Sequence, residues 1–473
     1  MCRLYFSLIC LLLITSSTFA SLSVDTVVKR IRINRELLNI GIISDAQFPE
    51  NDENLSVGHW GGVMNGPKHV HRALNYFKKM SVDMIIMNGD MVNSPSGGNA
   101  YNTYNMLLDD VYGKERTGMP LLIYPMGNHE FYSSNAENLY KDNVELPLNS
   151  HYVVNGIHFI GVSCSDGNGG YTEDRLEYLR HHLEIAYHEN KTNPIIVISH
   201  MPFKVDNFFG GQWESPQAKE FYQILSAYPQ VVYLCGHSHY PLFDDLSVIQ
   251  KDFTIINTGS TSYFDLDWNT LKNKNMLDKD LPNEYENPQL IGIFKQADID
   301  GRDEVNQGWI MDLNSRTGNI NLRRMNYDLS RQFGYNIVLQ DLYRRNFTYT
   351  EAQMRANAKS PYFKKGSHIN CFVCDDGVVD ICFNSASPDV LTKHYMMIIT
   401  DPDGNQKKIR FLAKGYYQGF DLPYMEHVRY YGSKKKGKYQ VKIKAVSCLG
   451  KESSFLQSDY MFLLLSDKNF TKP

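Results

Sequence analysis

The chain has 473 residues, which is enough for two or three domains with large buried cores. Apolar residues make up 42% of it and charged residues 21%, so most of the chain should be globular. The formal net charge is −4 and no long basic block is present, so nucleic-acid binding is not expected.

The first twenty residues have the pattern of a cleaved secretory signal peptide (residues 1–20). Arg3 precedes an apolar stretch over residues 4–14, and the small residue Ala20 suits cleavage after it. The stretch is shorter than the roughly 20 apolar residues of a membrane-spanning helix, and no other run is long enough, so we expect no transmembrane span in the mature chain. The sequence therefore predicts a secreted or periplasmic (extracytoplasmic) protein. The alternatives are an uncleaved membrane anchor and a lipoprotein anchored through Cys10.

From about residue 39 to residue 260, apolar β-branched runs alternate with helical periodicities, which predicts a layered α/β domain. The predicted buried strands are Ile40–Ser44, Met84–Met87, Leu121–Met126, Ile195–Ile198 and Val231–Cys235. The predicted helices are Pro67–Met80, Tyr101–Tyr112, Thr172–His188 and Ser215–Ala227. Asn155-Gly156 lies between two further strand-like stretches and is a hairpin signal, which indicates a second sheet with antiparallel pairing.

A polar motif follows each of the five predicted strands. The motifs are Asp45-Ala46-Gln47, Asn88-Gly89-Asp90, Gly127-Asn128-His129-Glu130, Ser199-His200 and Gly236-His237-Ser238-His239. Because the carboxyl ends of parallel strands form the edge where α/β sheets place their sites, we expect these side chains to converge. Carboxylates, amides and imidazoles from several loops can hold two divalent cations. Each motif alone is weak evidence, but together they predict a dinuclear site for phosphate-ester hydrolysis.

After His239 the pattern changes to short strands, and residues 265–288 are charged and irregular, as in a surface loop or insertion. The predicted strands here are Ser247–Ile249, Thr254–Asn257, Leu290–Phe294, Gly308–Leu313 and Asn319–Met325. A distinct β-rich region begins near Gly334, with a hairpin signal at Asp403-Gly404. Its repeated short strands predict an immunoglobulin- or fibronectin-like β-sandwich over residues 335–473. This accessory domain either binds a glycan or protein partner or is a structural cap.

Six cysteines remain after signal cleavage. Cys164 and Cys235 end apolar runs and are expected to be small core residues. In an oxidising compartment the four late cysteines can form up to two disulfides, with three pairings open. A zinc or redox site at the Cys-x-x-Cys pair is the less favoured alternative, since no second such pair occurs. The four late cysteines are Cys371, Cys374, Cys382 and Cys448.

The ordered motifs resemble the calcineurin-like metallophosphoesterase superfamily, whose pattern is D-x-H, G-D, G-N-H-[DE], H and G-H-x-H. The resemblance covers about residues 38–326, within a predicted domain over residues 38–330, and implies a four-layer α/β sandwich with two mixed β-sheets. It also implies that His129 is no metal ligand but faces the substrate, stabilises the phosphoryl oxygens and protonates the leaving group. By the same resemblance one metal is held by Asp45, Gln47, Asp90 and His239, and the other by Asp90, Asn128, His200 and His237, with Asp90 as the bridge.

Gln47 departs from the superfamily pattern, which has histidine at this position. In one interpretation the amide oxygen of Gln47 replaces an imidazole nitrogen, and this harder donor favours Mn²⁺, with Mg²⁺, Fe or Zn²⁺ as alternatives. In the other, the ligand position is weakened and activity has been lost. The segments Ile42–Phe48 and Gly127–Tyr132 resemble manganese-dependent ADP-ribose/CDP-alcohol diphosphatases, which also carry D-x-Q and cleave a pyrophosphate. We therefore favour the first interpretation.

The substrate is predicted to be a small-molecule phosphate ester or nucleotide, cleaved at a phosphodiester or pyrophosphate bond. His59 and Trp60 lie in a polar loop near the expected metal edge, and Phe131 and Tyr132 adjoin His129, so all four are candidate substrate-binding residues. For Trp60, Phe131 and Tyr132, packing in the fold is the competing interpretation. A phosphomonoesterase of the acid-phosphatase or nucleotidase type is the alternative function, and a catalytically weak binding protein that uses the C-terminal domain is a second.

Overall fold

A computed structural model describes residues 27–49, 66–95, 99–204, 217–264, 306–373, 379–387, 389–413, 415–416, 425–430, 437–457 and 462–464. The strands of the first part are β1 (Lys29–Ile31), β2 (Leu37–Ile43), β3 (Met84–Met87), β4 (Leu121–Ile123), β5 (Asn149–Val154), β6 (Ile157–Val162), β7 (Ile195–Ile198), β8 (Val231–Cys235), β9 (Val248–Gln250), β10 (Thr254–Asn257), β11 (Gln307–Asn314), β12 (Ile320–Asn326) and β13 (Arg331–Leu339). Its helices are α1 (Gly66–Met80), α2 (Asn99–Tyr112), α3 (Ala136–Val144), α4 (Glu173–Glu189) and α5 (Ala218–Ser226), with short 3-10 turns at His129–Phe131 and Asp245–Ser247.

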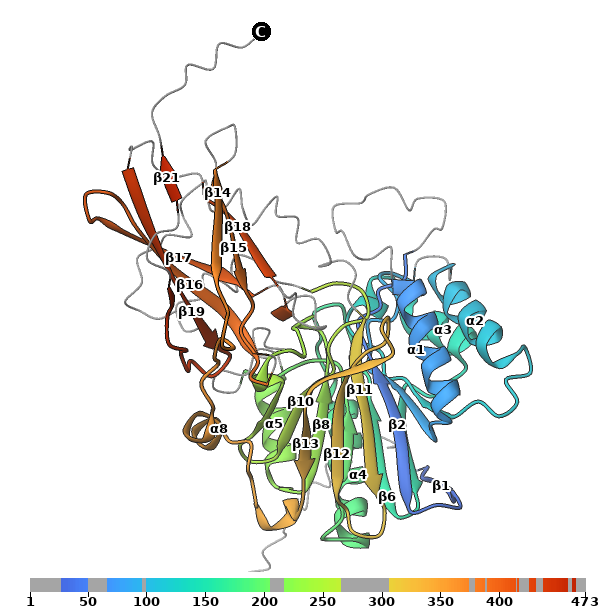
Figure 1. Ribbon diagram of the computed structural model, residues 1–473. Helices are drawn as coiled ribbons and strands as arrows, with labels where there is room; N and C mark the ends of the chain where they lie inside the picture. Colours follow the sequence, from blue (N-terminus) through green and yellow to red (C-terminus); the bar gives the residue numbers. More distant parts are fainter. Residues whose placement is uncertain are drawn as a thin grey trace, which may run out of the picture.

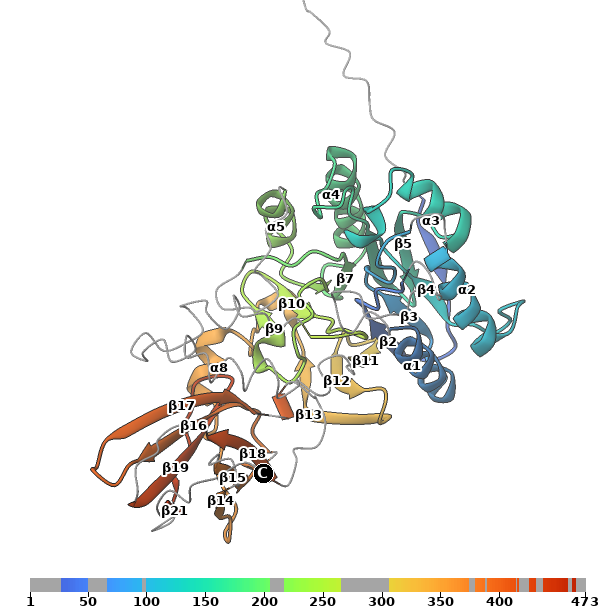
Figure 2. The same cartoon turned by 90° about the horizontal axis from the view of Figure 1, so that it is seen from above.

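Two mixed sheets lie at the centre of this part (Figure 1). The six-stranded sheet has the order β13-β12-β11-β2-β3-β4, and the seven-stranded sheet has the order β1-β5-β6-β7-β8-β10-β9. Ile40 and Ile42 of β2 pack between the sheets. Helices α1, α2 and α3 cover the outer face of the six-stranded sheet, where Phe77 is buried, and α4 and α5 cover the other sheet with Leu179 and Phe221 (Figure 2). These four layers confirm the predicted fold.

Most predicted elements lie at or near their predicted positions. The bounds of β3, β7, β8 and β10 are those predicted, and Asn155-Gly156 joins the antiparallel strands β5 and β6. Both turn residues have positive φ, 49° and 81°, as a type I′ hairpin turn requires. The sequence pattern does not predict α3, whose nine residues are too few for a clear helical periodicity. The predicted signal peptide (1–20) and the predicted strand Leu290–Phe294 lie outside the described residues.

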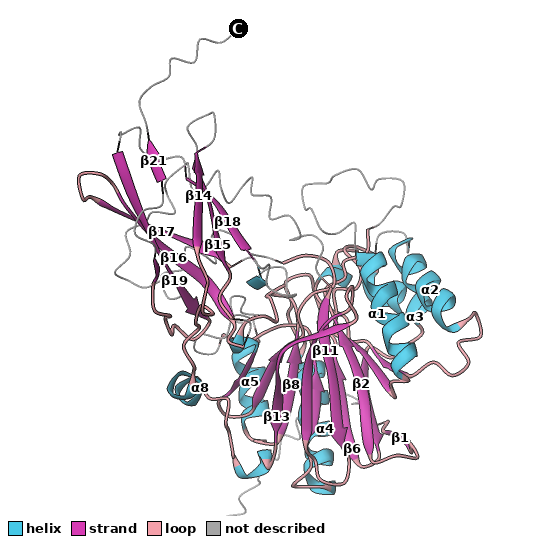
Figure 3. Cartoon of the chain, in the orientation of Figure 1, coloured by secondary structure: helices cyan, strands magenta, loops and turns pink. Residues whose placement is uncertain are grey.

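The C-terminal part consists of two further sheets, consistent with a β-sandwich (Figures 1 and 3). Its elements are a 3-10 turn at Leu342–Arg344, α8 (Glu351–Asn357), β14 (Ile369–Val373), β15 (Val379–Asn384), β16 (Thr392–Thr400), β17 (Gln406–Leu412), β18 (Met425–Tyr430), β19 (Gly437–Ser447), β20 (Leu456–Gln457) and β21 (Phe462–Leu464). One sheet has the order β14-β15-β18, and the other has the order β17-β16-β19-β20 with β21 also paired to β19. Phe383 of the first packs edge-on against Tyr395 of the second, with ring centroids 4.9 Å apart, so the sheets share a core.

The predicted boundary between residues 330 and 335 falls inside a strand. β13 pairs antiparallel with β12 from Asn326↔Arg331 to Ile320↔Leu339, so it belongs to the six-stranded sheet. The first part of the fold therefore extends to at least Leu339. Strand periodicity predicts that a strand exists but carries no information on the sheet it joins, which is why the sequence assigned β13 to the wrong side.

The described cysteines are all free, and two of them lie in the core as predicted: Cys164 and Cys235 are fully buried. Cys374 lies outside the described residues, so the disulfide pairings remain a prediction. None of the described helices combines the length and the apolar character needed to cross a membrane.

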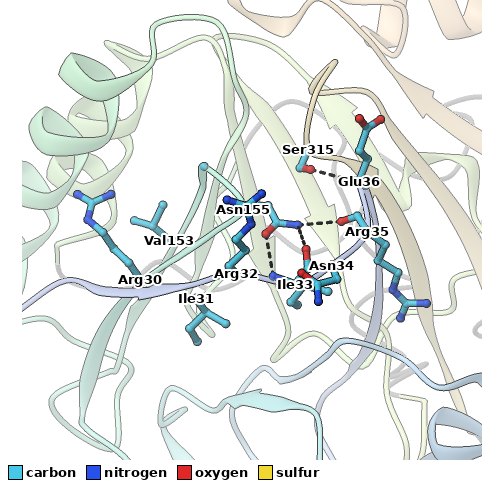
Figure 4. Close-up of a pocket in the computed structure, with 11 residues that line it drawn as sticks. Arg30, Ile31, Arg32, Ile33, Asn34, Arg35, Glu36, Val153, Asn155 and Ser315 are labelled. Carbon is cyan, nitrogen blue, oxygen red and sulfur yellow. Dashed lines mark hydrogen bonds between the residues drawn. The ribbon is translucent and has the colours of Figure 1, made fainter.

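A cavity of about 750 Å³ lies where β2 begins, at the opposite end of that strand from the Asp45 motif. Three arginines line it, but Arg30 pairs with Glu189 and Arg35 pairs with Asp83. The side chain of Asn155 crosses the cavity wall and bonds the backbone of Ile33 through both its oxygen and its nitrogen (Figure 4). This region therefore fastens the amino-terminal strand to the β5–β6 hairpin.

Three buried histidines form a chain between β5, β6 and α4. His151 Nδ1 lies 2.6 Å from His182 Nδ1, and His151 Nε2 lies 2.9 Å from His158 Nδ1. Burial, together with the neighbouring His182, lowers the pKa of His151 to about 2, and burial also lowers the pKa of His158. In the unfolded chain these groups titrate near pH 6.5, so the unfolded state binds more protons at acid pH.

We therefore expect the fold to lose stability as the pH falls below about 6.5, by up to about 1.4 kcal/mol per pH unit for each such group. Between about pH 7 and pH 5, the unfolding free energy of His151→Gln should fall by roughly 1–2 kcal/mol less than that of the parent chain. The control is His188→Gln, at an exposed position of α4. Urea titrations at both pH values measure this. A variant with the parent's pH dependence would contradict the expectation.

Candidate metal centre

The five motifs meet where the carboxyl ends of the two sheets adjoin. Three motifs follow β2, β3 and β4 of the six-stranded sheet, and two follow β7 and β8 of the seven-stranded sheet. Both sets are parallel neighbours. Backbone hydrogen bonds join the motifs, from Gln47 N to Asp90 O at 2.9 Å and from Gly236 N to His200 O at 2.8 Å. The site is therefore built from two sheets, whereas the sequence pattern predicts the edge of a single sheet.

His200 lies between the two predicted carboxylate ligands. Its Nε2 is 2.9 Å from Asp90 Oδ2 and 3.7 Å from Asp45 Oδ1. Its Nδ1 donates to the carbonyl of Asn88 at 2.6 Å, so the lone pair of the neutral ring is on Nε2. Two acceptors therefore face each other with no donor between them. Asp90 Oδ2 and His200 Nε2 are both buried without a hydrogen-bond donor.

His239 repeats this arrangement at the other carboxylate. Its Nδ1 faces the carbonyl of Tyr263 at 3.1 Å, and its Nε2 lies 3.2 Å from Asp45 Oδ1. The amide Nε2 of Gln47 is 3.2 Å from Nε2 of His239 and 3.2 Å from Nε2 of His129. Oxygen and nitrogen of an amide are assigned from such contacts. A turn of this amide would present its oxygen to the space beside Asp45.

The remaining predicted ligands complete the group. His237 Nδ1 lies 2.9 Å from Asn128 Oδ1. Ligand atoms of Asp90, His200 and His237 all lie within 4.8 Å of one another. The seven predicted ligands are thus brought together from residues far apart in the chain. The buried lone pairs of Asp90 Oδ2 and His200 Nε2, which have no hydrogen-bond donor, fit a cation, because a positive charge satisfies facing lone pairs.

Charge at the centre shifts several pKa values. Burial would raise the pKa of Asp90, but His200 and His129 hold it well below its usual range. Burial would lower the pKa of His200, but Asp90 and Asp45 raise it to about 10. Burial and the neighbouring His200 lower the pKa of His237 to about 3. The site therefore favours positive charge between the carboxylates and neutral imidazole at His237.

The backbone at the ligands is left-handed. φ is 54° at Asp45, 47° at Gln47, 50° at Asp90, 68° at His237 and 48° at His239. Such conformations cost on the order of 1–3 kcal/mol each and persist where surrounding contacts enforce them. In both D-x-Q and H-x-H the two left-handed residues flank one residue, which turns both side chains toward the same space. The sequence pattern does not predict these left-handed conformations, because only glycine signals a positive φ clearly.

Motif glycines leave room for the ligands. A Cβ on Gly127 would lie 2.2 Å from Asp90 Oδ1, and one on Gly236 would lie 2.6 Å from Asp45 Oδ2. Gly236 has no positive φ, and the left-handed residues of this motif are His237 and His239. Its role is to permit the close approach of the carboxylate.

Glu130 organises the loops from beneath. Its carboxylate is fully buried and accepts the backbone N–H groups of Asp90 at 2.9 Å, Met91 at 2.8 Å and Gly127 at 2.7 Å, and the hydroxyl of Tyr124 at 2.6 Å. Burial and the neighbouring Asp90 raise the pKa of Glu130 to about 7. The sequence pattern includes Glu130 in its motif but does not predict this structural role. The signal for its role is an acid that directly follows the ligand residues of a buried strand end.

A polar loop after β10 also supports the centre and was not predicted. The hydroxyls of Ser260 and Ser262 donate to the carbonyl of Asp45 at 3.2 Å and 2.6 Å. Thr261 donates to the carbonyl of Ser44 through its N–H at 3.1 Å and its hydroxyl at 3.0 Å. These bonds hold the left-handed Asp45 in place. The run of five small residues after a predicted strand, Thr258–Ser262, could have indicated this.

His129 lies at the open side of the group. Its Nδ1 faces the carbonyl of Asn93 at 3.0 Å, and its side chain is 20% exposed, unlike those of Asp90 and His200. The ring of Tyr132 lies 4.6 Å from it between centroids, and the Tyr132 hydroxyl accepts from Asn128 Nδ2 at 3.1 Å.

Of the predicted substrate residues, only Tyr132 has a described position beside the ligands and an exposed side chain. Phe131 packs against two apolar cores, which favours the packing interpretation for that residue. His59 and Trp60 lie outside the described residues.

Residues 38–241 match the family model described as calcineurin-like phosphoesterase. This part of the chain is therefore similar to calcineurin-like phosphoesterases. A similar curated protein is the 3′,5′-cyclic adenosine monophosphate phosphodiesterase CpdA of Vibrio vulnificus (strain CMCP6), 24% identical over 191 residues; the match covers 39% of this chain and 63% of that relative. A dimetal phosphatase from Danio rerio aligns with a TM-score of 0.42 and 11% identity, over 64% of this chain and 99% of that one. The chain spans less than two thirds of the length of that curated relative.

Replacing the Glu130 carboxylate should disorder the phosphoesterase centre. Glu130→Gln puts an amide donor against backbone donors, so we expect a loss on the order of 3 kcal/mol in unfolding free energy and weaker metal binding. Denaturant titration and metal analysis after dialysis measure these. Glu115→Gln, at an exposed position, is the matched control. Parent-like stability and metal content in Glu130→Gln would contradict the organising role.

Proposed function

We propose that the chain is a dinuclear-metal phosphoesterase that hydrolyses phosphodiester or nucleotide pyrophosphate bonds. The observation that carries the proposal is the pair of facing acceptors, His200 against Asp90 at 2.9 Å and His239 against Asp45 at 3.2 Å. Each pair lies in a buried site and places a carboxylate oxygen against an imidazole lone pair. Two cations would satisfy both pairs.

The ligand sets proposed here follow the contacts. Asp90 contacts His200 and lies 3.9 Å from His129, near the middle of the group, which supports its role as the bridge. One cation would be held by Asp45, Gln47, Asp90 and His239, and the other by Asp90, Asn128, His200 and His237.

When bound, the two cations would polarise the phosphoryl oxygens and supply a deprotonated water as nucleophile. The protein's own groups position the substrate and handle the proton. His129 Nδ1 is held by the carbonyl of Asn93, and its Nε2 faces Gln47 and Asp90 at the centre. There the ring, when both nitrogens are protonated, can contact a phosphoryl oxygen or donate a proton to the leaving oxygen. Tyr132 lies beside this ring and limits its rotation.

Manganese is the metal we propose for both positions. The proposed donors are oxygens and imidazoles with no thiolate, and the Gln47 amide adds an oxygen where histidine would add nitrogen, which favours a harder cation than zinc. For this role the amide must direct its oxygen to the cation, away from the donor contact that its nitrogen makes with His239.

A diester or pyrophosphate is the substrate class we favour. The relative named a cyclic adenosine monophosphate phosphodiesterase supports diester cleavage. The D-x-Q resemblance supports a pyrophosphate. The exposed ring of Tyr132 beside His129 offers a surface for a base or sugar.

We also propose that the protein acts outside the cytoplasm. The support is the apolar stretch over residues 4–14, ahead of the predicted cleavage site. The C-terminal sheets would then bind a glycan or protein partner in that compartment.

The proposed activity is tested with purified protein, bis-p-nitrophenyl phosphate, p-nitrophenyl phosphate and ADP-ribose, each with Mn²⁺, Mg²⁺ and Zn²⁺. We expect kcat/KM for the diester or for ADP-ribose to exceed that for the monoester at least about tenfold, highest with Mn²⁺. Preference for the monoester would overturn the substrate class. No hydrolysis with any of the three metals would overturn the function.

In the same assay Gln47→His serves as the matched variant for metal choice. An imidazole there should raise the activity with Zn²⁺ relative to Mn²⁺. An unchanged ratio would argue against Gln47 as a ligand.

Replacing His129 and Asp90 should have different effects. We expect His129→Ala to lower kcat about 10²–10⁴-fold with metal content retained, because it removes a proton-transfer group but no ligand. Asp90→Ala should lose activity and both metals. Metal content by elemental analysis, beside kcat and KM, distinguishes them. Metal loss in His129→Ala, or full metal content in Asp90→Ala, would contradict the assigned roles.

A further inference from the structure

A second group of metal-binding side chains lies in the C-terminal part, on the sheet β14-β15-β18. Asp380 and Cys382 are two residues apart on β15, so they lie on the same face of that sheet. His427 on the edge strand β18 is directly paired with Cys382. Pairing therefore brings a carboxylate, a thiol and an imidazole together from two strands.

Their atoms converge on one point. Cys382 Sγ lies 3.1 Å from His427 Nδ1, and Asp380 Oδ2 lies 3.9 Å from the same nitrogen. One ligand atom from each of the three lies within 4.8 Å of the others. A tetrahedral zinc ion with ordinary bond lengths would separate sulfur from nitrogen by about 3.6 Å and nitrogen from oxygen by about 3.4 Å. The observed separations differ from these by about half an ångström each.

The geometry argues against a catalytic relay. In a relay the thiol and the carboxylate would contact opposite nitrogens of the imidazole. Here both contact Nδ1, and His427 Nδ1 cannot bond both in the relay manner. Three potential metal-ligand atoms around one point are the arrangement that a shared cation needs.

Two of the three side chains are open to solvent, while Cys382 is buried. Ile381, Phe383 and Val428, which alternate with these residues along β15 and β18, are buried in the apolar core. The side chain of His427 is 63% exposed and that of Asp380 is 32% exposed. A cation can therefore enter from solution, and a fourth position stays open to water or a partner's side chain.

We propose that Asp380, Cys382 and His427 bind a single divalent cation of the zinc class, separate from the dinuclear centre. A thiolate with imidazole and carboxylate selects zinc over manganese or magnesium. On binding, the S–H bond breaks, the proton goes to solvent, and sulfur bonds the metal. The cation would cross-link edge strand β18 to its neighbour β15 on one face of the sheet. This inference does not depend on the hydrolase activity.

Cobalt titration of the full, reduced chain tests the site, because only a thiolate ligand gives the near-ultraviolet sulfur-to-cobalt charge-transfer band. The proposed ligands of the dinuclear centre are oxygen and nitrogen atoms, so that centre contributes none. We expect the band to reach the amplitude of one thiolate-bound cobalt per chain, whatever cobalt the dinuclear centre also takes, and to disappear when excess Zn²⁺ is added. It should be absent in Cys382→Ser, and in His427→Gln and Asp380→Asn cobalt should bind at least about tenfold more weakly.

Cys371→Ser is the matched control, because Cys371 lies on the neighbouring strand β14 opposite Ile381, not opposite Cys382. It should keep the band. Three results would overturn the proposal: no band in a chain whose Cys382 thiol is confirmed free, a band that persists in Cys382→Ser, or Cys382 found in a disulfide. Phosphoesterase activity, measured in parallel, should be unchanged in Cys382→Ser whether or not that activity takes the proposed form.

Discussion

The centre depends on a conflict between lone pairs. His200 and His239 each give the proton of Nδ1 to a backbone carbonyl and turn Nε2 toward a carboxylate. Inside a protein such facing acceptors repel unless positive charge lies between them. The carbonyls of Asn88 and Tyr263 thus do more than orient two rings, since they fix the tautomer whose Nε2 lone pair can bind a cation. The same polarity keeps the pKa of Asp90 low and that of His200 high.

The fold holds this arrangement through contacts that have no part in the chemistry. Five ligand residues adopt left-handed backbone conformations that an isolated chain would seldom populate. The Glu130 carboxylate accepts hydrogen bonds from backbone N–H groups of two loops, and the hydroxyls of Ser260 and Ser262 donate to the carbonyl of Asp45. Each bond is modest in net energy. Together they are cooperative, because every one fixes the same short stretch of backbone between the sheets.

Sequence reasoning finds what local patterns encode. Buried β-branched runs give β3, β7 and β8 with their bounds, and the polar residues after them give the candidate ligands. It does not give the left-handed φ of His237, which depends on contacts from another strand, nor the support from Ser260, which comes from 215 residues beyond Asp45. It misplaces β13 because sheet membership is a long-range property. Cys382 and His427 are likewise 45 residues apart and meet only through strand register.

The C-terminal part is tied to the segment that continues from the metal ligands. Asp244, five residues after His239, is fully buried and accepts the hydroxyl of Tyr416 at 2.7 Å, while Lys393 lies 3.4 Å from the same oxygen. The other Asp244 oxygen caps the turn at Leu246. A buried carboxylate left without these partners would be costly. The C-terminal sheets therefore supply the partners of the Asp244 carboxylate. Losing these sheets would leave the charge of Asp244 uncompensated beside the loop that carries His237 and His239.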